Sequence, residues 1–250
     1  MRKQIFRFYW WLERLVFPGL LFSQTRYFQL LKAHIPKDCL WADLGCGHQM
    51  FAEWMMAEQN EMAARARQLV GVDLDWEGLR RNPYLHHKIY GNLEAIPLPD
   101  RSFDVVTANM VVEHLDRPAK VLSEVKRLLR PDGRFFFHTP NSRCVMMRIA
   151  AHLPQAVKNL LALVLEGRKE EDVFPTRYRM NTRADIERLA ADAGLEVEQI
   201  HTFSSSAITA TFGPLAIFEL LYLRWIERPG FEDLRSNLLV ILRQTGGKLA

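Results

Sequence analysis

The sequence has few cysteines, and they lack the spacings that cysteine-based sites require. Three cysteines, Cys39, Cys46 and Cys144, occur in 250 residues, and no two of them form a CxxC pair. A small, odd number of thiols is typical of a reducing compartment and argues against a disulfide framework. We therefore expect a cytoplasmic protein without structural disulfides.

Long blocks of one charge and long apolar runs are also missing. The net charge is only +4, so nucleic acid is not an expected partner. The stretch 1–22 is basic and rich in aromatic residues, but Glu13 and Arg14 interrupt it. It is too short and too charged to span a bilayer, and no cleavage site of small residues follows. It predicts an amphipathic helix that packs on the domain, or that contacts a membrane surface or a second subunit.

A third glycine is absent where a dinucleotide-binding turn has one. The stretch WADLGCGHQM (41–50) ends an apolar run and contains Gly45 and Gly47, with Met50 at the third glycine position. A pyrophosphate requires a helix N-terminus packed closely against the turn, so Met50 argues against NAD. S-adenosylmethionine carries no phosphate. Its ammonium suits Asp43, and its ribose hydroxyls suit Asp73 after the next apolar run.

Short apolar runs alternate with helical patterns from residue 39 onward, which is typical of a parallel sheet with crossover helices. The last such unit, 181–200, has a capping box at Thr182 and Asp185 and a C-cap at Gly194. The predicted strands outside this unit are 39–45, 68–74, 87–92, 102–111, 133–140 and 237–244. We expect an α/β fold with a doubly wound, mostly parallel, seven-stranded Rossmann-like sheet.

Two further helices are predicted beside these strands. The spacing after the glycine turn predicts a long helix through 56–68. A second helix follows the fourth strand, with Asp116 as its N-cap and Pro118 in its first turn.

The chain is expected to form a single domain over residues 1–250. Within it we expect a helical N-terminal extension (1–37), a cofactor-binding core (38–141) and two insertions that cover the substrate (142–180 and 204–235). Each insertion contains an apolar helical stretch, at 156–167 and at 214–227. These stretches either line a hydrophobic acceptor cavity or only cover the sheet.

Four motifs stand in order along the core: DLGCGHQ, VGVDLD, GNLEAIPLPDRSFDVV and VKRLLRPDGRFFFHTPN. Together they resemble the class I S-adenosylmethionine-dependent methyltransferases, in particular the small-molecule type with methyltransferase domain 11 and the ubiquinone O-methyltransferases. The resemblance implies that acids hold the amino end and the ribose of the cofactor, and that Asn109 closes the methionyl side by its backbone. The cofactor-binding residues that it implies are Asp43, Gly45, Cys46, Gly47, Asp73, Leu74, Asn92, Leu93 and Asn109.

The pair Glu113 and His114, after the fourth strand, resembles the E-H pair of the ubiquinone O-methylation enzymes. Met110 stands where those enzymes have a further acid, so no metal is expected. We interpret His114 as a general base for an oxygen acceptor. The alternative is a histidine that bonds a loop or lines the cofactor, and Glu113 alternatively caps the following helix.

Residues at two places are candidates for the acceptor site, each with a plain alternative. His138 and Asn141, at the end of the fifth strand, face the expected pocket or else only satisfy loop backbone. Arg177, Tyr178 and Arg179 form a set that suits an acidic or polar acceptor, or else a solvated loop.

The predicted function is methyl transfer from S-adenosylmethionine to a small, partly hydrophobic molecule, with O-methylation as the leading interpretation. N- or C-methylation, a non-catalytic cofactor-binding protein and a nicotinamide dehydrogenase are the alternatives.

Overall fold

The computed structural model describes residues 2–145, 147–148, 175–205 and 215–245. The chain divides into two compact units, whose segments alternate along the sequence. The first, here called the helical unit, comprises residues 1–23, 141–175 and 202–237. The second, the sheet unit, comprises 24–140, 176–201 and 238–250. The expected N-terminal extension, residues 1–37, therefore contributes to both units, since residues 24–37 belong to the sheet unit.

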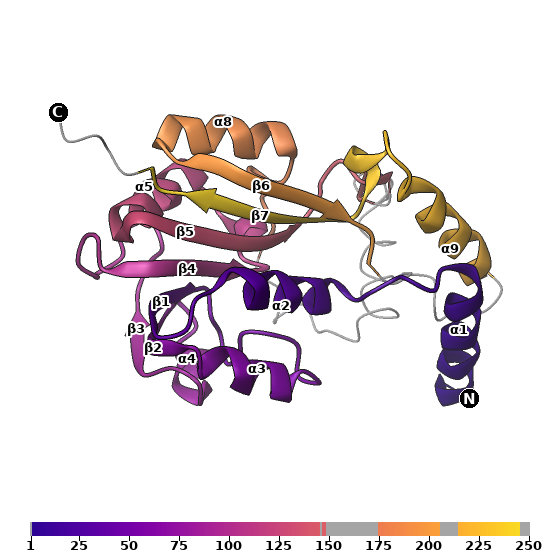
Figure 1. The fold of residues 1–250 in the computed structure, drawn as a ribbon, viewed down its shortest axis with the longest axis horizontal. Coiled ribbons are helices and arrows are strands. Elements are labelled where there is room, and N and C mark those ends of the chain that lie inside the picture. The colour runs from indigo at the N-terminus through magenta and orange to yellow at the C-terminus, as the bar shows by residue number, and fades with distance from the viewer. Residues whose placement is uncertain (1, 146, 149–174, 206–214, 246–250) are drawn as a thin grey trace. The chain divides into compact units, whose positions relative to one another are not determined.

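The fold is an α/β fold with a seven-stranded sheet in the order β3-β2-β1-β4-β5-β7-β6. The pairs β1·β2, β1·β4, β2·β3 and β4·β5 are parallel. Strand β7 is antiparallel, and its arrow points against that of β6 in Figure 1. The strands are β1 (Cys39–Leu44), β2 (Ala66–Asp73), β3 (His87–Tyr90), β4 (Phe103–Asn109), β5 (Leu129–Pro140), β6 (Glu196–Phe203) and β7 (Asn237–Arg243). This order confirms the predicted doubly wound sheet, with its switch point between β1 and β4.

The central strands form because both of their faces are covered, which favours continuous apolar runs. In β1 every residue except Leu40 is buried, and β7 is buried from Asn237 through Leu242. The two helices α5 (Pro118–Leu128) and α8 (Arg183–Ala193) pack against each other and share one apolar core with the sheet.

Two of the predicted helix boundaries are wrong and one unit is confirmed in detail. Helix α3 (Met56–Ala63) ends before residue 66, because residues 66–68 already pair with β1. The N-cap of α5 is Arg117, without a side-chain bond, so Asp116 is not its cap. In α8, Thr182 accepts a hydrogen bond from Asp185 N, and Gly194 closes the helix in the left-handed conformation at φ 71°.

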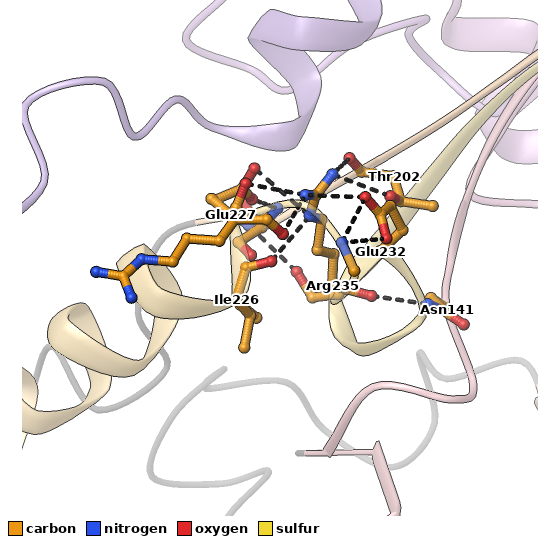
Figure 2. Close-up of polar contacts among 11 residues, drawn as sticks. Asn141, Thr202, Ile226, Glu227, Glu232 and Arg235 are labelled. Carbon is orange, nitrogen blue, oxygen red and sulfur yellow. Dashed lines mark hydrogen bonds and ion pairs between the residues drawn. The ribbon is translucent and has the colours of Figure 1, made fainter.

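Helices α1 (Arg2–Val16) and α9 (Leu215–Ile226) lie side by side in the helical unit (Figure 1). The half-buried Arg235 is the centre of a polar network at the end of α9 (Figure 2). Its guanidinium donates to the main-chain oxygens of Ile226, Glu227 and Thr202 over 3.0–3.2 Å. This arginine therefore joins the C-terminal end of α9 to the end of β6. The apolar stretch predicted at 156–167 lies outside the described residues.

Candidate functional site

The turn after β1 combines tight backbone geometry with open space. Gly45 and Gly47 have φ angles of 64° and 45°, in the region that favours glycine. A Cβ at Gly45 would collide with Val111, whereas a Cβ at Gly47 would meet no atom of the described residues within 4 Å. Gly45 is thus required by packing, and Gly47 leaves room for a ligand to approach the backbone. The carbonyl oxygens of Cys46 and Gly47 point toward the Asn82 side-chain amide, at 3.5 and 3.2 Å.

Asp73, at the end of β2, fixes this turn. Its Oδ2 accepts a hydrogen bond from Gly47 N at 2.7 Å, and its Oδ1 accepts one from Asp75 N at 2.7 Å. Asp75 in turn accepts from Gly78 N and caps the short helix α4 (Trp76–Arg81). The carboxylate therefore stands half-buried between two backbone turns, with lone pairs left for further donors.

Asp43, at the end of β1, is a buried carboxylate. Its Oδ1 accepts a 2.6 Å hydrogen bond from Thr107 Oγ1, which accepts one from Trp41 Nε1 at 2.7 Å. Burial raises the pKa of Asp43 to about 7, with a smaller contribution from the charge of Asp73, although the Thr107 bond opposes the shift. A buried carboxylate with a raised pKa is stabilised when a cation is placed beside it.

Asn109, at the end of β4, joins three elements through its side chain. Its Nδ2 donates to Met50 O at 2.7 Å and to Gln24 Oε1 at 2.8 Å. Its Oδ1 lies 2.9 Å from His138 Nδ1, on β5. Gln24 belongs to helix α2 (Ser23–His34), so this amide fixes α2 and the turn after β1 to the carboxyl edge of the sheet.

Tyr27 of α2 is fully buried beside this network. Its ring stacks on His138 with a centroid distance of 5.7 Å and meets Phe51 edge-on at 6.0 Å. Its hydroxyl has no hydrogen-bond partner among the residues that the structure describes. Burial, and then the nearby charge of Asp43, raise the pKa of Tyr27 well above its usual value. A buried hydroxyl without a partner costs free energy, which a ligand that supplies an acceptor or donor can recover.

Met50 lies where a dinucleotide-binding turn has its third glycine. It is buried, and its backbone N donates to Gln59 Oε1 at 3.1 Å. The chain does not enter helix α3 until Met56. The helix N-terminus that receives a pyrophosphate therefore does not follow this turn directly.

The segment after β4 is a short 3-10 helix, η1 (Val112–His114). Glu113 is buried, and its Oε2 accepts a hydrogen bond from Thr139 Oγ1 at 2.9 Å. Thr139 Oγ1 accepts another from Asn181 Nδ2 at 2.7 Å. Burial raises the pKa of Glu113. His114 is half-exposed at the end of η1, so the two residues of the pair have different environments.

The loop at 175–181 is bound to this segment. Arg177 N and Tyr178 N both donate to Glu113 O, at 2.6 and 3.1 Å. The Arg177 side chain forms a 2.9 Å ion pair with Asp116, and Arg179 donates to Asp116 O at 2.7 Å. Both guanidinium groups are thus engaged by the chain itself, and the half-buried Tyr178 adopts a positive φ of 52°.

Three of the remaining predicted residues follow the strands β2 and β3 of the sheet unit, and the fourth belongs to the helical unit. Asn92 follows β3, is exposed, and accepts a hydrogen bond from Glu94 N at 2.9 Å. Leu93 packs partly against the core, and Leu74 is exposed. Asn141 belongs to the helical unit, where its amide donates to Asp233 O and Arg235 O.

The structure gathers Asp43, the glycine turn, Asp73 and Asn109 at the carboxyl ends of β1, β2 and β4. His138 is buried in contact with Asn109 and Tyr27 rather than exposed at a surface. Sequence reasoning did not find Gln24 and Tyr27, which precede the first strand. A polar residue three positions before an aromatic one on one helical face was the available signal, and it is a weak one. Thr139 and Asn181, which hold Glu113, were also missed.

A sequence model of the methyltransferase-domain family matches residues 24–200. The chain belongs to the class I S-adenosylmethionine-dependent methyltransferases. The matched range begins in α2 and covers the glycine turn, both acids and η1, so S-adenosylmethionine is the cofactor of the site's family.

Two relatives and one solved structure illustrate the similarity of this methyltransferase to known proteins. It is 36% identical over 159 residues to a probable S-adenosylmethionine-dependent methyltransferase of Mycolicibacterium smegmatis, covering 62% of this chain and 51% of that one. It is 28% identical over 203 residues to a ubiquinone biosynthesis O-methyltransferase of Neisseria meningitidis, covering 76% of each. An S-adenosylmethionine-dependent methyltransferase from Mesorhizobium loti has the same fold, with a TM-score of 0.54, 20% identity and coverage of 86% of this chain and 96% of that one. The chain thus spans about half the length of the mycobacterial relative.

Proposed function

We propose that this methyltransferase transfers a methyl group from S-adenosylmethionine to an oxygen atom of a small, partly hydrophobic molecule. The observation that carries the cofactor assignment is the buried Asp43 carboxylate, next to the open side of Gly47 and to Asp73. This arrangement places two acids and a clear approach to backbone at the switch point of the sheet, where open α/β sheets bind ligands. A cytoplasmic location and a small-molecule acceptor belong to the same proposal.

The residues present fit S-adenosylmethionine. Asp43 suits the ammonium, because a cation beside it relieves the cost of ionising a buried carboxylate. Asp73 suits the ribose, since its oxygens retain lone pairs after their two backbone bonds. The Tyr27 hydroxyl, near the charge of Asp43, gains a partner from the methionyl end. When bound, the cofactor supplies a methyl group activated by the sulfonium.

The other assigned residues support the cofactor through backbone and packing. Gly45, Cys46 and Gly47 offer the turn, and Asn109 fixes its far side through Met50 O. Leu74, Asn92 and Leu93 border the adenine side. The Asn92 oxygen already accepts from Glu94 N, and its second lone pair is available for an adenine amino group.

His114 is the proposed base that takes the proton from the acceptor hydroxyl. His114 is half-exposed and ends η1, the segment that follows β4, where a base for an oxygen acceptor is required. Glu113 positions this segment, because its side chain binds Thr139 and its carbonyl oxygen receives the loop amides of Arg177 and Tyr178. The O-methylation part of the proposal is further supported by the name of the Neisseria relative.

The loop residues have a narrower role in this proposal than in the sequence interpretation. Arg177 and Arg179 anchor the loop to Asp116, and Tyr178 is the member of the set whose side chain is proposed to face the acceptor. His138 acts by holding Asn109 rather than by touching the acceptor.

The test is acceptor profiling with cofactor that carries a labelled methyl group. Panels of phenols, amines and activated carbon acids of increasing hydrophobicity are incubated with the full chain, and product label is counted. Transfer to phenols in preference to amines and carbon acids is expected. Transfer to amines or carbon acids alone contradicts O-methylation but leaves the cofactor assignment intact. Absence of any transfer, together with tight cofactor binding, contradicts an enzymatic role.

A further inference from the structure

The helical unit buries one face of each of its two long helices against the other. Tyr9 and Leu12 of α1 share a core with Leu220 and Leu223 of α9. Arg224 Nη1 also donates to Val16 O at 2.9 Å, at the end of α1. These faces account for the packing between the two helices. Other apolar side chains on α1 and α9 are not needed for it.

Each helix carries a second apolar stripe that remains exposed. The two stripes have the same spacing, i, i+3 and i+7, and their side chains are 43–71% exposed. They consist of Phe8, Trp11 and Leu15 on α1 and of Phe218, Leu221 and Trp225 on α9. Six large apolar side chains on two contacting helices are far more than the scattered exposure of an ordinary surface.

Arginines accompany both stripes. Arg7 and Arg14 are exposed on α1, Arg224 is exposed on α9, and Arg228 is exposed just beyond it. The acids on and next to these helices, Glu13, Glu219 and Glu227, are all half-buried, and Glu227 accepts a hydrogen bond from Ser204 N. The apolar stripes are thus bordered by positive charge.

We propose that the α1–α9 pair is a docking surface for the interface of an anionic lipid bilayer. Aromatic and aliphatic side chains enter the boundary between headgroups and acyl chains, while arginines pair with anionic headgroups. The longer helix, α1, has 15 residues, and at about 1.5 Å per residue it is shorter than the roughly 30 Å hydrocarbon core. No helix among the described residues is long and apolar enough to cross a membrane. The pair therefore lies on the membrane rather than in it.

Charge favours a bilayer over a second copy of this chain. A symmetric dimer through these stripes would bring equivalent arginines toward one another, which opposes association. An anionic bilayer instead satisfies both the apolar stripes and the arginines that border them. The sequence alone pointed to the N-terminal helix as the membrane or subunit contact, and the structure adds α9 as its other half.

The network of Arg235 supports a fixed platform (Figure 2). Arg235 binds the last carbonyl oxygens of α9 and forms ion pairs with Glu227 and Glu232. It holds the C-terminal end of α9, next to Trp225, in a defined position. The docking surface is thus preorganised, which lowers the cost of binding.

The test is co-sedimentation of the full chain with vesicles, without cofactor or acceptor. Vesicles of phosphatidylcholine alone are compared with vesicles that contain 30% phosphatidylglycerol, at low and high salt. We expect binding to the anionic vesicles that weakens with salt. The double variant Trp11→Gln, Phe218→Gln should lose at least tenfold in partition coefficient. The variant Trp76→Gln is the matched control, since Trp76 is exposed to 50%, close to the 52% of Trp11, but lies on α4 of the sheet unit.

The charge reversal Arg7→Glu, Arg14→Glu tests the same surface without touching its core, and it should also lose binding to anionic vesicles. The proposal is overturned if the native chain does not bind anionic vesicles, or if Trp76→Gln reduces binding as much as the double variant. It is also overturned if the native chain is a dimer by light scattering that the stripe variants dissociate. Because the cofactor is absent throughout, these outcomes are independent of the methyltransferase proposal.

Discussion

The sheet unit and the helical unit each hold side chains in environments that are unusual for their type, but of opposite kinds. The sheet unit buries polar groups at its carboxyl edge: Asp43, Thr107, Glu113, His138 and Thr139 are all inside. The helical unit instead exposes large apolar groups on α1 and α9. Buried polar groups cost free energy unless they are paired, and exposed apolar patches cost it unless they are covered.

The difference indicates where each unit meets a partner. In the sheet unit, the ligand that we propose for the buried acid and the Tyr27 hydroxyl is the cationic methionyl end of the cofactor. In the helical unit, the partner that we propose for the exposed stripes is an anionic membrane surface. The two proposals assign different ligands to the two units, so substitutions in one unit should leave the other's binding unchanged.

The largest effect is expected from His114→Ala. If His114 takes the acceptor's proton, kcat for a phenolic acceptor should fall by roughly 100- to 10,000-fold. Cofactor affinity and vesicle binding should not change. The measurement is steady-state kinetics with labelled cofactor, and His201→Ala on β6 is the control. An undiminished kcat would remove the base role and leave His114 as a structural residue.

Asp43→Asn should weaken binding of S-adenosylhomocysteine by about 30- to 1,000-fold, since it removes one charge of a buried pair. The amide oxygen of the variant still accepts the Thr107 bond, so the local fold is kept. Calorimetric titration measures the effect. Asp100→Asn, on an exposed carboxylate of the same unit, is the control and should bind normally.

The same substitution should stabilise the cofactor-free protein at alkaline pH. The folded-state pKa of Asp43 is about 7, above its usual value of 3.8. The stability that the protonated Asp43 side chain contributes, relative to the ionised one, is therefore fully present below pH 3.8 and is lost as the pH rises through 7. At pH 8 the Asn variant should exceed the native chain by on the order of 1–4 kcal/mol, and at pH 4 the difference should be small. Urea unfolding at the two pH values measures it. A native chain that is the more stable at pH 8 would contradict the buried, uncompensated acid.

Arg235→Met tests the frame of the helical unit. Removing this half-buried guanidinium takes the donor away from several carbonyl oxygens and breaks its ion pair with Glu227, which keeps its bond from Ser204 N. The loss should cost about 2–4 kcal/mol. Arg143→Met breaks an exposed pair with Asp233 and should cost less than about 1 kcal/mol. Hydrogen exchange should locate the loss in α9. Equal costs for the two variants would show that Arg235 does not organise the unit.

Cofactor affinity should fall about tenfold between pH 8 and pH 6, because the ionised fraction of an Asp43 with a pKa near 7 falls by that factor. The carboxylate binds the ammonium, so affinity is lost on the acid side. Asp43→Asn should flatten this dependence. A native affinity that does not change over this range would contradict the assigned contact.

Tyr27→Phe has the smallest expected effect, and it should lower ligand affinity without lowering the stability of the cofactor-free protein. Loss of the hydroxyl should weaken S-adenosylhomocysteine binding by about fivefold, because one hydrogen bond is lost. It should leave the cofactor-free protein equally or slightly more stable, since an unsatisfied buried group is removed. Unchanged affinity together with increased stability would mean that the hydroxyl serves no ligand.

The sheet, and the position of two acids at the ends of its strands, were predictable because their signals are local. Apolar runs end in Asp43 and Asp73, and the αL glycine at 194 and the Thr182–Asp185 box mark α8 directly. The end of α3 was not predictable, because residues 66–68 leave the helix to pair with β1. Asp116 was misassigned because its partners, Arg177 and Arg179, lie far along the chain. Tyr27 and the exposed stripe of α9 depend on tertiary placement, since periodicity does not tell which of two apolar faces is buried.

The most direct test of the central claim is calorimetric titration at pH 8. The native full chain is titrated with S-adenosylhomocysteine and, separately, with NAD. The Asp43→Asn variant is titrated with S-adenosylhomocysteine. The glycine turn with Met50 at its third position, the buried Asp43 and the proposed ribose contact of Asp73 predict one binding event per chain for S-adenosylhomocysteine. They also predict no measurable binding of NAD and at least a 30-fold loss in the variant, in line with removal of a buried charge. Binding of NAD in preference to S-adenosylhomocysteine, or an Asp43→Asn variant that binds as tightly as the native chain, would contradict it.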